Sequence, residues 1–312
     1  MKLYLKVNNL KTLQNVDTLV YSAVSKASLF VDKHSPVEYR LNLESAKVLN
    51  ARRESLFYSD KPLLQSVKGV YFGNSSCEHL ISSLKELSEA YFFCKKRYWN
   101  FVYLFAPLSP FSFESAKEIL GFLDDKKASV VVNDFGLLEV ARAYKNITII
   151  LGLNFTKVIK NAFIDTLTPT DVDETQLENQ KRLASHIEFE NEDVRAFYKE
   201  LGVGRFGVEN LGFALDFINE KPKMQVDFYY PYIMVSNSKA CDIAGLYYDR
   251  QNYFVTESCN KHCLHTALEF AQGDIFGLYQ RYNSIYKSKT ALHIPDLLRK
   301  DDKNRLVWEL FL

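Results

Sequence analysis

The chain has 312 residues, of which 47% are hydrophobic, so it can bury the core of one large α/β domain or two smaller ones. Its 39 lysines and arginines nearly balance its 38 aspartates and glutamates. The net charge of +1 gives no support for a broad nucleic-acid-binding face or a membrane-surface role. A local basic groove stays open as an interpretation, because a net charge hides patches of either sign.

The sequence contains no candidate for export or membrane insertion. Its N-terminus lacks an apolar core of signal-peptide length, and its apolar runs, such as ITIILGL, fall far short of the roughly 20 residues of a membrane span. We therefore expect a cytoplasmic protein with no membrane span. In that reducing compartment disulfides are not expected, and clustered cysteines are more often metal ligands or catalytic groups.

The first 66 residues carry several strand-like pieces with few helical stretches between them. These pieces read KLYLKV, DTLVYSAV, SLFVDK, VEYRLNL and RESLFYS. Alternating apolar residues and β-branched or aromatic side chains favour strands. We therefore predict a β-rich N-terminal extension, or an elaborated barrel entry, over residues 1–66, followed by a barrel-like domain over residues 67–312.

From residue 67 onward, short apolar runs alternate with segments of helical periodicity. The runs lie near residues 67–73, 101–107, 128–134, 147–153, 205–210 and 226–235. Continuous apolar strands that alternate with helices predict a parallel sheet covered by helices. The number of units favours an α/β fold of the TIM-barrel-like (β/α) kind over an open sheet. The acidic, polar residues 163–193 predict a surface excursion with one amphipathic helix.

Three cysteines lie in one late segment with the spacing C-x17-C-x3-C. They are Cys241, Cys259 and Cys263, and a fourth, Cys77, lies far upstream after the predicted strand VYFG. Two thiolates four residues apart can lie on one side of a helical turn, as a soft metal or an iron–sulfur cluster requires. The late cluster and the remote Cys77 could thus tie both ends of a fold together at one site.

The spacing alone leaves three interpretations of these cysteines. Irregular spacing suits a 4Fe–4S cluster, whereas zinc sites usually show C-x2-C pairs, which this chain lacks. His262 and His265 flank Cys263, so a mixed Cys/His zinc site is the second interpretation. The third is a set of unrelated core thiols, because free cysteine is among the most buried residue types. That third interpretation is strongest for Cys94, which lies among aromatic residues in a predicted helix.

Four motifs in order resemble a known family. The strand VYFG leads to Cys77, NDFG spans residues 133–136, the strand PYIMVSNSKAC ends at Cys241, and the Cys259–Cys263 pair follows. This order resembles the collagenase-like peptidases (peptidase family U thirty-two), most closely their UbiV-type iron–sulfur branch. The resemblance covers roughly residues 66–285.

The resemblance implies a TIM-barrel-like fold with one 4Fe–4S cluster held by Cys77, Cys241, Cys259 and Cys263. It also implies oxygen-independent hydroxylation, or a related modification of a small molecule or RNA, and a heterodimer with a related cluster-bearing protein. Four thiolates on four irons would favour electron transfer or a structural role over direct binding of substrate. The alternative is a non-catalytic scaffold or partner subunit that carries the cluster or zinc.

Two carboxylates are candidate catalytic residues because they follow predicted barrel strands, where the catalytic groups of such barrels lie. Asp134 follows one strand, but it could instead cap the helix that begins at Phe135. Glu209 ends a later strand, but it could instead be a loop carboxylate or half of a salt bridge. A peptidase is disfavoured, because the chain has neither G-x-S-x-G nor H-E-x-x-H.

Overall fold

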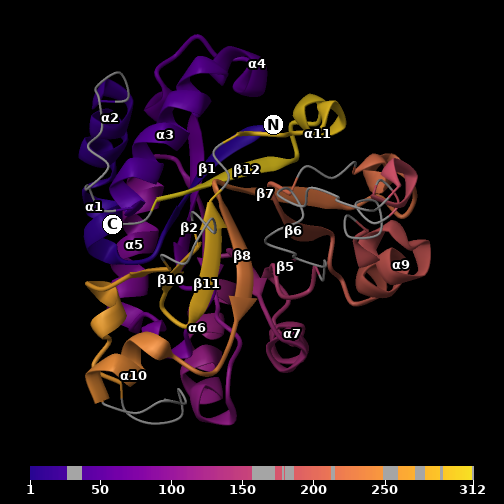
Figure 1. The fold of residues 1–312 in the computed structure, drawn as a ribbon. Helices are drawn as coiled ribbons and strands as arrows, with labels where there is room; N and C mark the ends of the chain where they lie inside the picture. Colours follow the sequence, from indigo (N-terminus) through magenta and orange to yellow (C-terminus); the bar gives the residue numbers. More distant parts are fainter. Residues whose placement is uncertain are drawn as a thin grey trace.

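The computed structural model describes residues 1–26, 37–156, 173–177, 179, 186–211, 215–248, 259–270, 278–288 and 291–310. Eight parallel strands form a closed barrel in the order β1-β2-β3-β4-β5-β6-β7-β12 (Figure 1). They are β1 (Lys2–Val7), β2 (Val67–Gly73), β3 (Asn100–Leu104), β4 (Ser129–Val132), β5 (Thr148–Leu151), β6 (Arg205–Glu209), β7 (Gln225–Tyr230) and β12 (Arg305–Glu309). The prediction of a TIM-barrel-like fold is confirmed.

Side chains fill the interior of the barrel. Alternate residues of each strand point inward, as the two-residue period of a strand requires. The rings of Tyr4, Tyr71 and Tyr229 meet edge to face there, with centroids 5.6 and 6.1 Å apart. The inward-facing apolar cluster consists of Tyr4, Tyr71, Val102, Leu104, Val131, Ile150, Tyr229 and Val307. The barrel therefore has a packed core rather than a pore.

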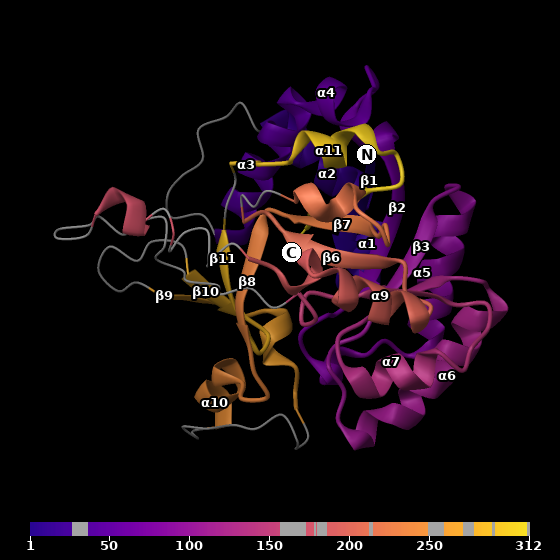
Figure 2. The same cartoon turned by 90° about the vertical axis from the view of Figure 1, so that its right-hand side faces the viewer.

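The larger core lies between the barrel strands and the helices around them. These helices are α5 (Leu84–Lys96), α6 (Phe113–Asp125), α7 (Phe135–Ala141) and α9 (Glu192–Glu200). A capping box between Ser83 and Glu86 starts α5, and its inner face buries Leu87, Ala90, Tyr91 and Cys94. Figure 2 shows α5, α6 and α7 on the outside of the barrel. Among the described residues no helix is long and apolar enough to cross a membrane.

The prediction of a β-rich N-terminal portion is wrong. After β1 the chain forms α1 (Leu10–Gln14), α2 (Val16–Lys26), α3 (Val37–Ala51), α4 (Arg53–Phe57) and the 3₁₀ turn η1 (Leu63–Ser66). The segments DTLVYSAV and VEYRLNL lie in these helices, and RESLFYS forms α4 with its first five residues. SLFVDK lies outside the described residues. The residues buried from α2 and α3 recur every three or four positions, which is the period of a helix.

The first 66 residues belong to the barrel rather than to a separate unit. β1 pairs with β2 on one side and with β12 on the other, so the barrel closes through the N-terminal strand. The indole Nε1 of Trp308 on β12 donates a hydrogen bond to Ser45 Oγ on α3 over 3.0 Å. The predicted boundary at residue 66 therefore falls inside the barrel.

A two-point ion pair fixes α2 against the end of α5. Arg97 donates to the two carboxylate oxygens of Asp17 over 2.7 and 2.5 Å, and this contact lowers the pKa of Asp17 below its usual 3.8. Because both side chains are partly exposed, Asp17→Asn is expected to cost only about 0.5–1 kcal/mol at pH 7. The wild-type advantage should be full above pH 3.8 and shrink as the pH falls through the folded pKa. Urea denaturation at several pH values measures the difference in unfolding free energy between the wild type and the variant. A difference independent of pH would show that the ion pair is not its cause.

A second, antiparallel sheet lies at the carboxyl end of the barrel. Its strands have the order β8 (Tyr232–Asn237), β11 (Ser284–Ser288), β10 (Leu278–Arg281) and β9 (Leu268–Phe270). Pro231, which has no N–H to donate, separates β7 from β8, so the predicted single strand over 226–235 is two strands in two sheets. Figure 2 shows this sheet and α10 (Asp242–Tyr248) beside the barrel, away from α5 and α6.

Contacts from three barrel strands locate this sheet over the mouth where those strands end. They run from Asn8 to Tyr282, from Ser76 to Tyr286 and from the backbone N–H of Met234 to Glu209. The remaining short elements are η2 (Glu78–Leu80), η3 (Pro110–Ser112), η4 (Glu188–Glu190), η5 (Asp216–Asn219), η6 (His262–Leu264) and α11 (Asp296–Lys300). Most of the predicted acidic excursion lies outside the described residues, and α9 begins at its end.

Candidate cluster site

Cys77 lies at the carboxyl-end mouth of the barrel, four residues after β2. The strand ends at Gly73, which has a φ of +117°. A Cβ at this position would lie 2.6 Å from the carbonyl oxygen of Leu104, so only glycine fits there. The side-chain oxygen of Asn74 then accepts hydrogen bonds from the backbone N–H groups of Ser76 and Cys77, each over 2.8 Å. This turn holds the Cys77 thiol beneath the second sheet.

Cys241 lies between β8 and α10. The backbone N–H of Ala244 donates to its Sγ over 3.4 Å, in the manner of a helix cap. The thiol also lies 3.7 Å from the carbonyl oxygen of Tyr282, on the turn between β10 and β11. Cys241 is therefore held from its own helix and from the second sheet.

Cys259 and Cys263 lie on either side of a tight backbone reversal. Lys261 adopts φ +58°, and its backbone N–H donates to Cys259 Sγ over 3.4 Å. The turn η6 then buries Cys263, while Cys259 stays half-buried. The ring of His262 stacks on Tyr247 of α10 with centroids 3.9 Å apart, which docks this turn against the helix of Cys241.

The structure brings the four predicted cysteines together. Cys77, Cys241 and Cys263 belong to one buried apolar cluster. Burial raises the pKa values of Cys77 and Cys263 to about 12, and that of Cys241 above its usual value. The neighbouring thiols, Cys259 among them, raise these values further. Ionised together they would repel one another, so a positively charged centre is needed to hold them as thiolates.

Thiols are soft donors, which suit an iron–sulfur cluster or a zinc ion. Among the described residues no group of three or more His, Cys, Asp or Glu side chains converges closely enough to hold one metal ion. A zinc ion would need sulfur atoms about 3.8 Å apart, since each Zn–S bond is about 2.3 Å. A 4Fe–4S cluster binds each thiolate through a different iron and spaces them more widely. Backbone N–H groups aimed at the sulfurs of Cys241 and Cys259 are the contacts that tune such clusters.

Tyrosines shield the apolar side of the thiols. Tyr232, Tyr279 and Tyr286 of the second sheet pack on one another, and Tyr279 and Tyr286 stack with centroids 5.8 Å apart. Tyr229, Tyr230 and Tyr232 all belong to the core, because each is at most 2% exposed. A low-dielectric shell of this kind controls the potential of a bound redox centre.

A salt bridge joins the two loops that carry Cys77 and Cys241. Lys239 Nζ lies 2.7 Å from Glu78 Oε1, and the other oxygen of Glu78 accepts three hydrogen bonds from Ser109 and Ser112, each 2.7 Å long. Burial opposes ionisation of Glu78, but Lys239 and the serine donors outweigh it and lower its pKa to about 2. The carboxylate thus connects the Cys77 loop, the Cys241 loop and the start of α6.

Substitutions in this bridge should have graded effects on the metal-free protein. Glu78→Gln is expected to cost about 2–3 kcal/mol of unfolding free energy, because it weakens four hydrogen bonds to a buried charge. Lys239→Met should cost about 1 kcal/mol, because the serine donors remain. The exposed pair Lys117 and Glu114 is the matched control, and Lys117→Met should cost the least of the three. Urea denaturation measures the unfolding free energies of the three variants. Equal losses in all three would show that the buried bridge of Glu78 contributes no more than an exposed ion pair.

The two candidate catalytic carboxylates are both held by backbone N–H groups. Asp134 accepts from Leu137 over 2.7 Å and from Leu108 over 3.0 Å, so the alternative that it caps the helix beginning at Phe135 is confirmed. Glu209 is 5% exposed and accepts from the backbone N–H of Met234 over 2.5 Å. Glu209 does lie at the carboxyl-end mouth, but as a tie between the barrel and the second sheet.

A buried ion pair at the same mouth was missed by the sequence reasoning. Lys6 Nζ lies 2.6 Å from Glu309 Oε1, and the side chains are 3% and 4% exposed. Lys6 also contacts Ser75 Oγ over 3.2 Å and lies over the ring of Tyr229. The available signal was a lysine one residue before the end of KLYLKV and a glutamate at the end of RLVWE.

Comparisons with known proteins leave the family open. No protein-family model matches the chain, and no curated protein matches it in sequence. Among solved structures, the chain is similar to the orotidine 5'-monophosphate decarboxylase of Plasmodium berghei, with 11% sequence identity, 74% of this chain and 79% of that chain covered, and a TM-score of 0.34. The barrel fold itself is defined by the closed order of its eight strands.

Proposed function

We propose that this chain is an iron–sulfur protein whose Cys77, Cys241, Cys259 and Cys263 hold one 4Fe–4S cluster at the carboxyl-end mouth of the barrel. The observation that carries the proposal is the convergence of Cys77, Cys241 and Cys263, which are up to 186 residues apart, in one apolar cluster. Cys259 interacts electrostatically with all three. The backbone donors to Cys241 and Cys259 support it further. When bound, the cluster would supply one-electron chemistry or cross-link the mouth.

The resemblance to the UbiV-type branch suggests the reaction that this centre serves. We propose oxygen-independent hydroxylation, or a related modification of a small molecule or RNA, in the cytoplasm, with a related cluster-bearing protein as heterodimer partner. The tyrosine shell and the apolar cluster keep the thiols of Cys77, Cys241 and Cys263 apart from bulk solvent. Zinc in the same site remains the competing occupant.

Low-temperature electron paramagnetic resonance distinguishes these occupants. The metal-free protein is loaded with iron and sulfide without oxygen and then reduced with dithionite. A paramagnetic signal with sulfide retained is expected from a reduced 4Fe–4S cluster. Retention of iron without sulfide, or preferential retention of zinc in competition, would contradict the proposal.

The held carboxylates favour a second candidate, a cluster-bearing partner subunit that is not catalytic by itself. Both oxygens of Asp134 accept backbone N–H groups, and the buried Glu209 ties two sheets together, so neither is set up as a proton acceptor for substrate. Mixing the reduced chain with an oxidised cluster-bearing homologue from the same cell tests this candidate. Electron transfer within a one-to-one complex supports the partner subunit, and turnover by the isolated chain contradicts it.

A further inference from the structure

The amino-terminal end of the barrel, at the far end from the cysteines, contains a strongly basic cavity. Its volume is about 410 Å³. The first residues of the strands β1, β3, β4, β6, β7 and β12 line it. Five lysines border it, namely Lys2, Lys95, Lys126, Lys127 and Lys303. Among the described residues that line it there is no carboxylate. These lysines come from distant parts of the sequence, so the chain's net charge of +1 conceals them.

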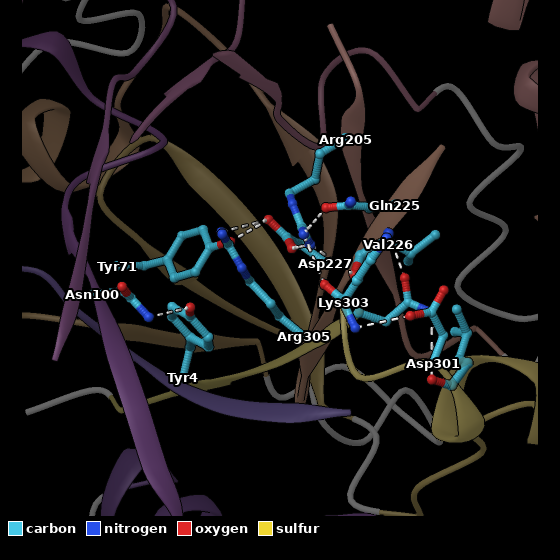
Figure 3. A network of polar contacts seen from close by, with 12 residues as sticks. Tyr4, Tyr71, Asn100, Arg205, Gln225, Val226, Asp227, Asp301, Lys303 and Arg305 are labelled. Atoms are coloured by element: carbon cyan, nitrogen blue, oxygen red, sulfur yellow. Dashed lines mark hydrogen bonds and ion pairs between the residues drawn. The ribbon is translucent and has the colours of Figure 1, made fainter. Parts of the chain in front are cut away.

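The buried Arg205 and the partly buried Arg305 form one wall of this cavity and share a single carboxylate. Arg205 lies 2.6 Å and Arg305 3.9 Å from the oxygens of Asp227, and the three side chains are 8%, 14% and 0% exposed (Figure 3). Tyr71 completes the group by accepting from Arg305 over 2.8 Å and contacting Asp227. Burial raises the pKa of Tyr71 well above its usual value, so the hydroxyl is neutral. The group thus carries one positive charge more than its carboxylate neutralises.

A second basic cavity adjoins the first. It has a volume of about 460 Å³ and shares Arg205, Gln225 and Lys303 with its neighbour. It adds Lys199 and Lys223, and its carboxylate, Asp301, is paired with Lys223 over 3.2 Å. Gathering so many like charges around two hollows costs free energy by repulsion, and a bound anion removes that cost.

The lining favours a compact anion over a nucleic acid. Single-stranded nucleic acids stack their bases on exposed aromatic rings. The aromatic rings of the first cavity belong to Tyr4, Tyr91 and Phe101, and they are only 2%, 6% and 6% exposed. Lysine and arginine in a polar hollow are the partners that phosphate groups take.

We propose that this basic cavity binds a small anion with two or more phosphate groups, through Lys95, Lys126 and Lys127 at its rim and Arg305 in its wall. The site is separate from the cysteines, so it can be tested whether or not the cluster is present. Its position at the amino-terminal end of the strands is unlike the usual ligand position in such barrels.

Isothermal titration calorimetry with inorganic triphosphate tests this site on the full chain. Lys95→Ala together with Lys127→Ala should weaken binding at least about tenfold, because two charge-assisted contacts are lost. The matched control combines Lys96→Ala with Lys145→Ala, which removes the same charge outside the cavity and should change affinity less than about twofold. Replacing Lys95 and Lys127 by arginine should restore binding. Circular dichroism checks that every variant is folded.

Two comparisons give the experiment its other outcomes. If ATP binds at least as tightly as inorganic triphosphate, the result supports recognition of a phosphate chain, whether it is free or part of a nucleotide. No binding of triphosphate by the wild type, or equal weakening by the two double variants, would overturn the proposal. Binding of a single-stranded RNA without binding of triphosphate would overturn it as well.

Discussion

Cys263→Ser is expected to remove the visible chromophore of the anaerobically purified protein and most of its iron and sulfide. Cys263 is buried at 5% exposure and interacts electrostatically with the thiols of Cys77, Cys241 and Cys259. A serine oxygen is a poorer ligand for a soft centre than a thiolate. Because cluster binding is coupled to folding, we also expect a lower melting temperature. Absorbance spectra and iron and sulfide analysis measure the effect.

Cys94→Ser is the matched control for this experiment. Cys94 is 0% exposed on the inner face of α5, and it belongs to the barrel–helix core rather than to the apolar cluster of the other cysteines. Its pKa is raised to about 12 by burial, with Arg97 as its charged neighbour. The variant should lose some stability but keep its colour. Loss of colour in Cys94→Ser with retention in Cys263→Ser would show that the ligand set is wrong.

Lys6→Met is expected to destabilise the protein by about 3–5 kcal/mol at pH 7, because it leaves the buried carboxylate of Glu309 without its partner. Burial raises the pKa of Glu309, and Glu209 nearby raises it further. Above pH 4.5 the carboxyl of Glu309 is ionised in the unfolded chain, but in the folded variant it should keep its proton up to its raised pKa. Stability should fall as the pH rises from 4.5 toward the folded pKa, so the loss should be larger at pH 7 than at pH 5. Urea denaturation at the two pH values measures it.

The double variant Lys6→Met with Glu309→Gln separates a lost ion pair from lost packing. Removing both charges should recover most of the stability, since a neutral pair is tolerated in a buried site where a single charge is not. The pH dependence assigned to Glu309 should disappear with it. A double variant as unstable as Lys6→Met would show that the methylene packing of Lys6, rather than its charge, holds the mouth together.

The barrel could be predicted because its strands are continuous apolar runs separated by amphipathic helices. The N-terminal helices could not be predicted, because Val16, Val20 and Ala23 lie among β-branched and aromatic residues that locally prefer strands. Their burial against the barrel decided the outcome. The second sheet was also missed, since Pro231 is the sole local mark that β7 ends and β8 begins.

The candidate site could likewise be predicted from the sequence only in part. Cysteines are few enough that their spacing indicates a common site, and the fold does bring Cys77 to the late trio. The residues that position them, such as Glu78 and Lys239, are ordinary charged residues whose pairing across 161 positions no local pattern reveals. The basic cavity is hidden for the same reason, because only barrel closure brings its lysines to one end.

The most direct test of the cluster is metal analysis of the wild-type protein purified without oxygen. We predict a brown protein with broad visible absorbance and about four irons and four sulfides per chain. Oxygen should bleach it as the cluster is destroyed. A colourless protein that contains stoichiometric zinc, with little iron and no sulfide, would contradict the account.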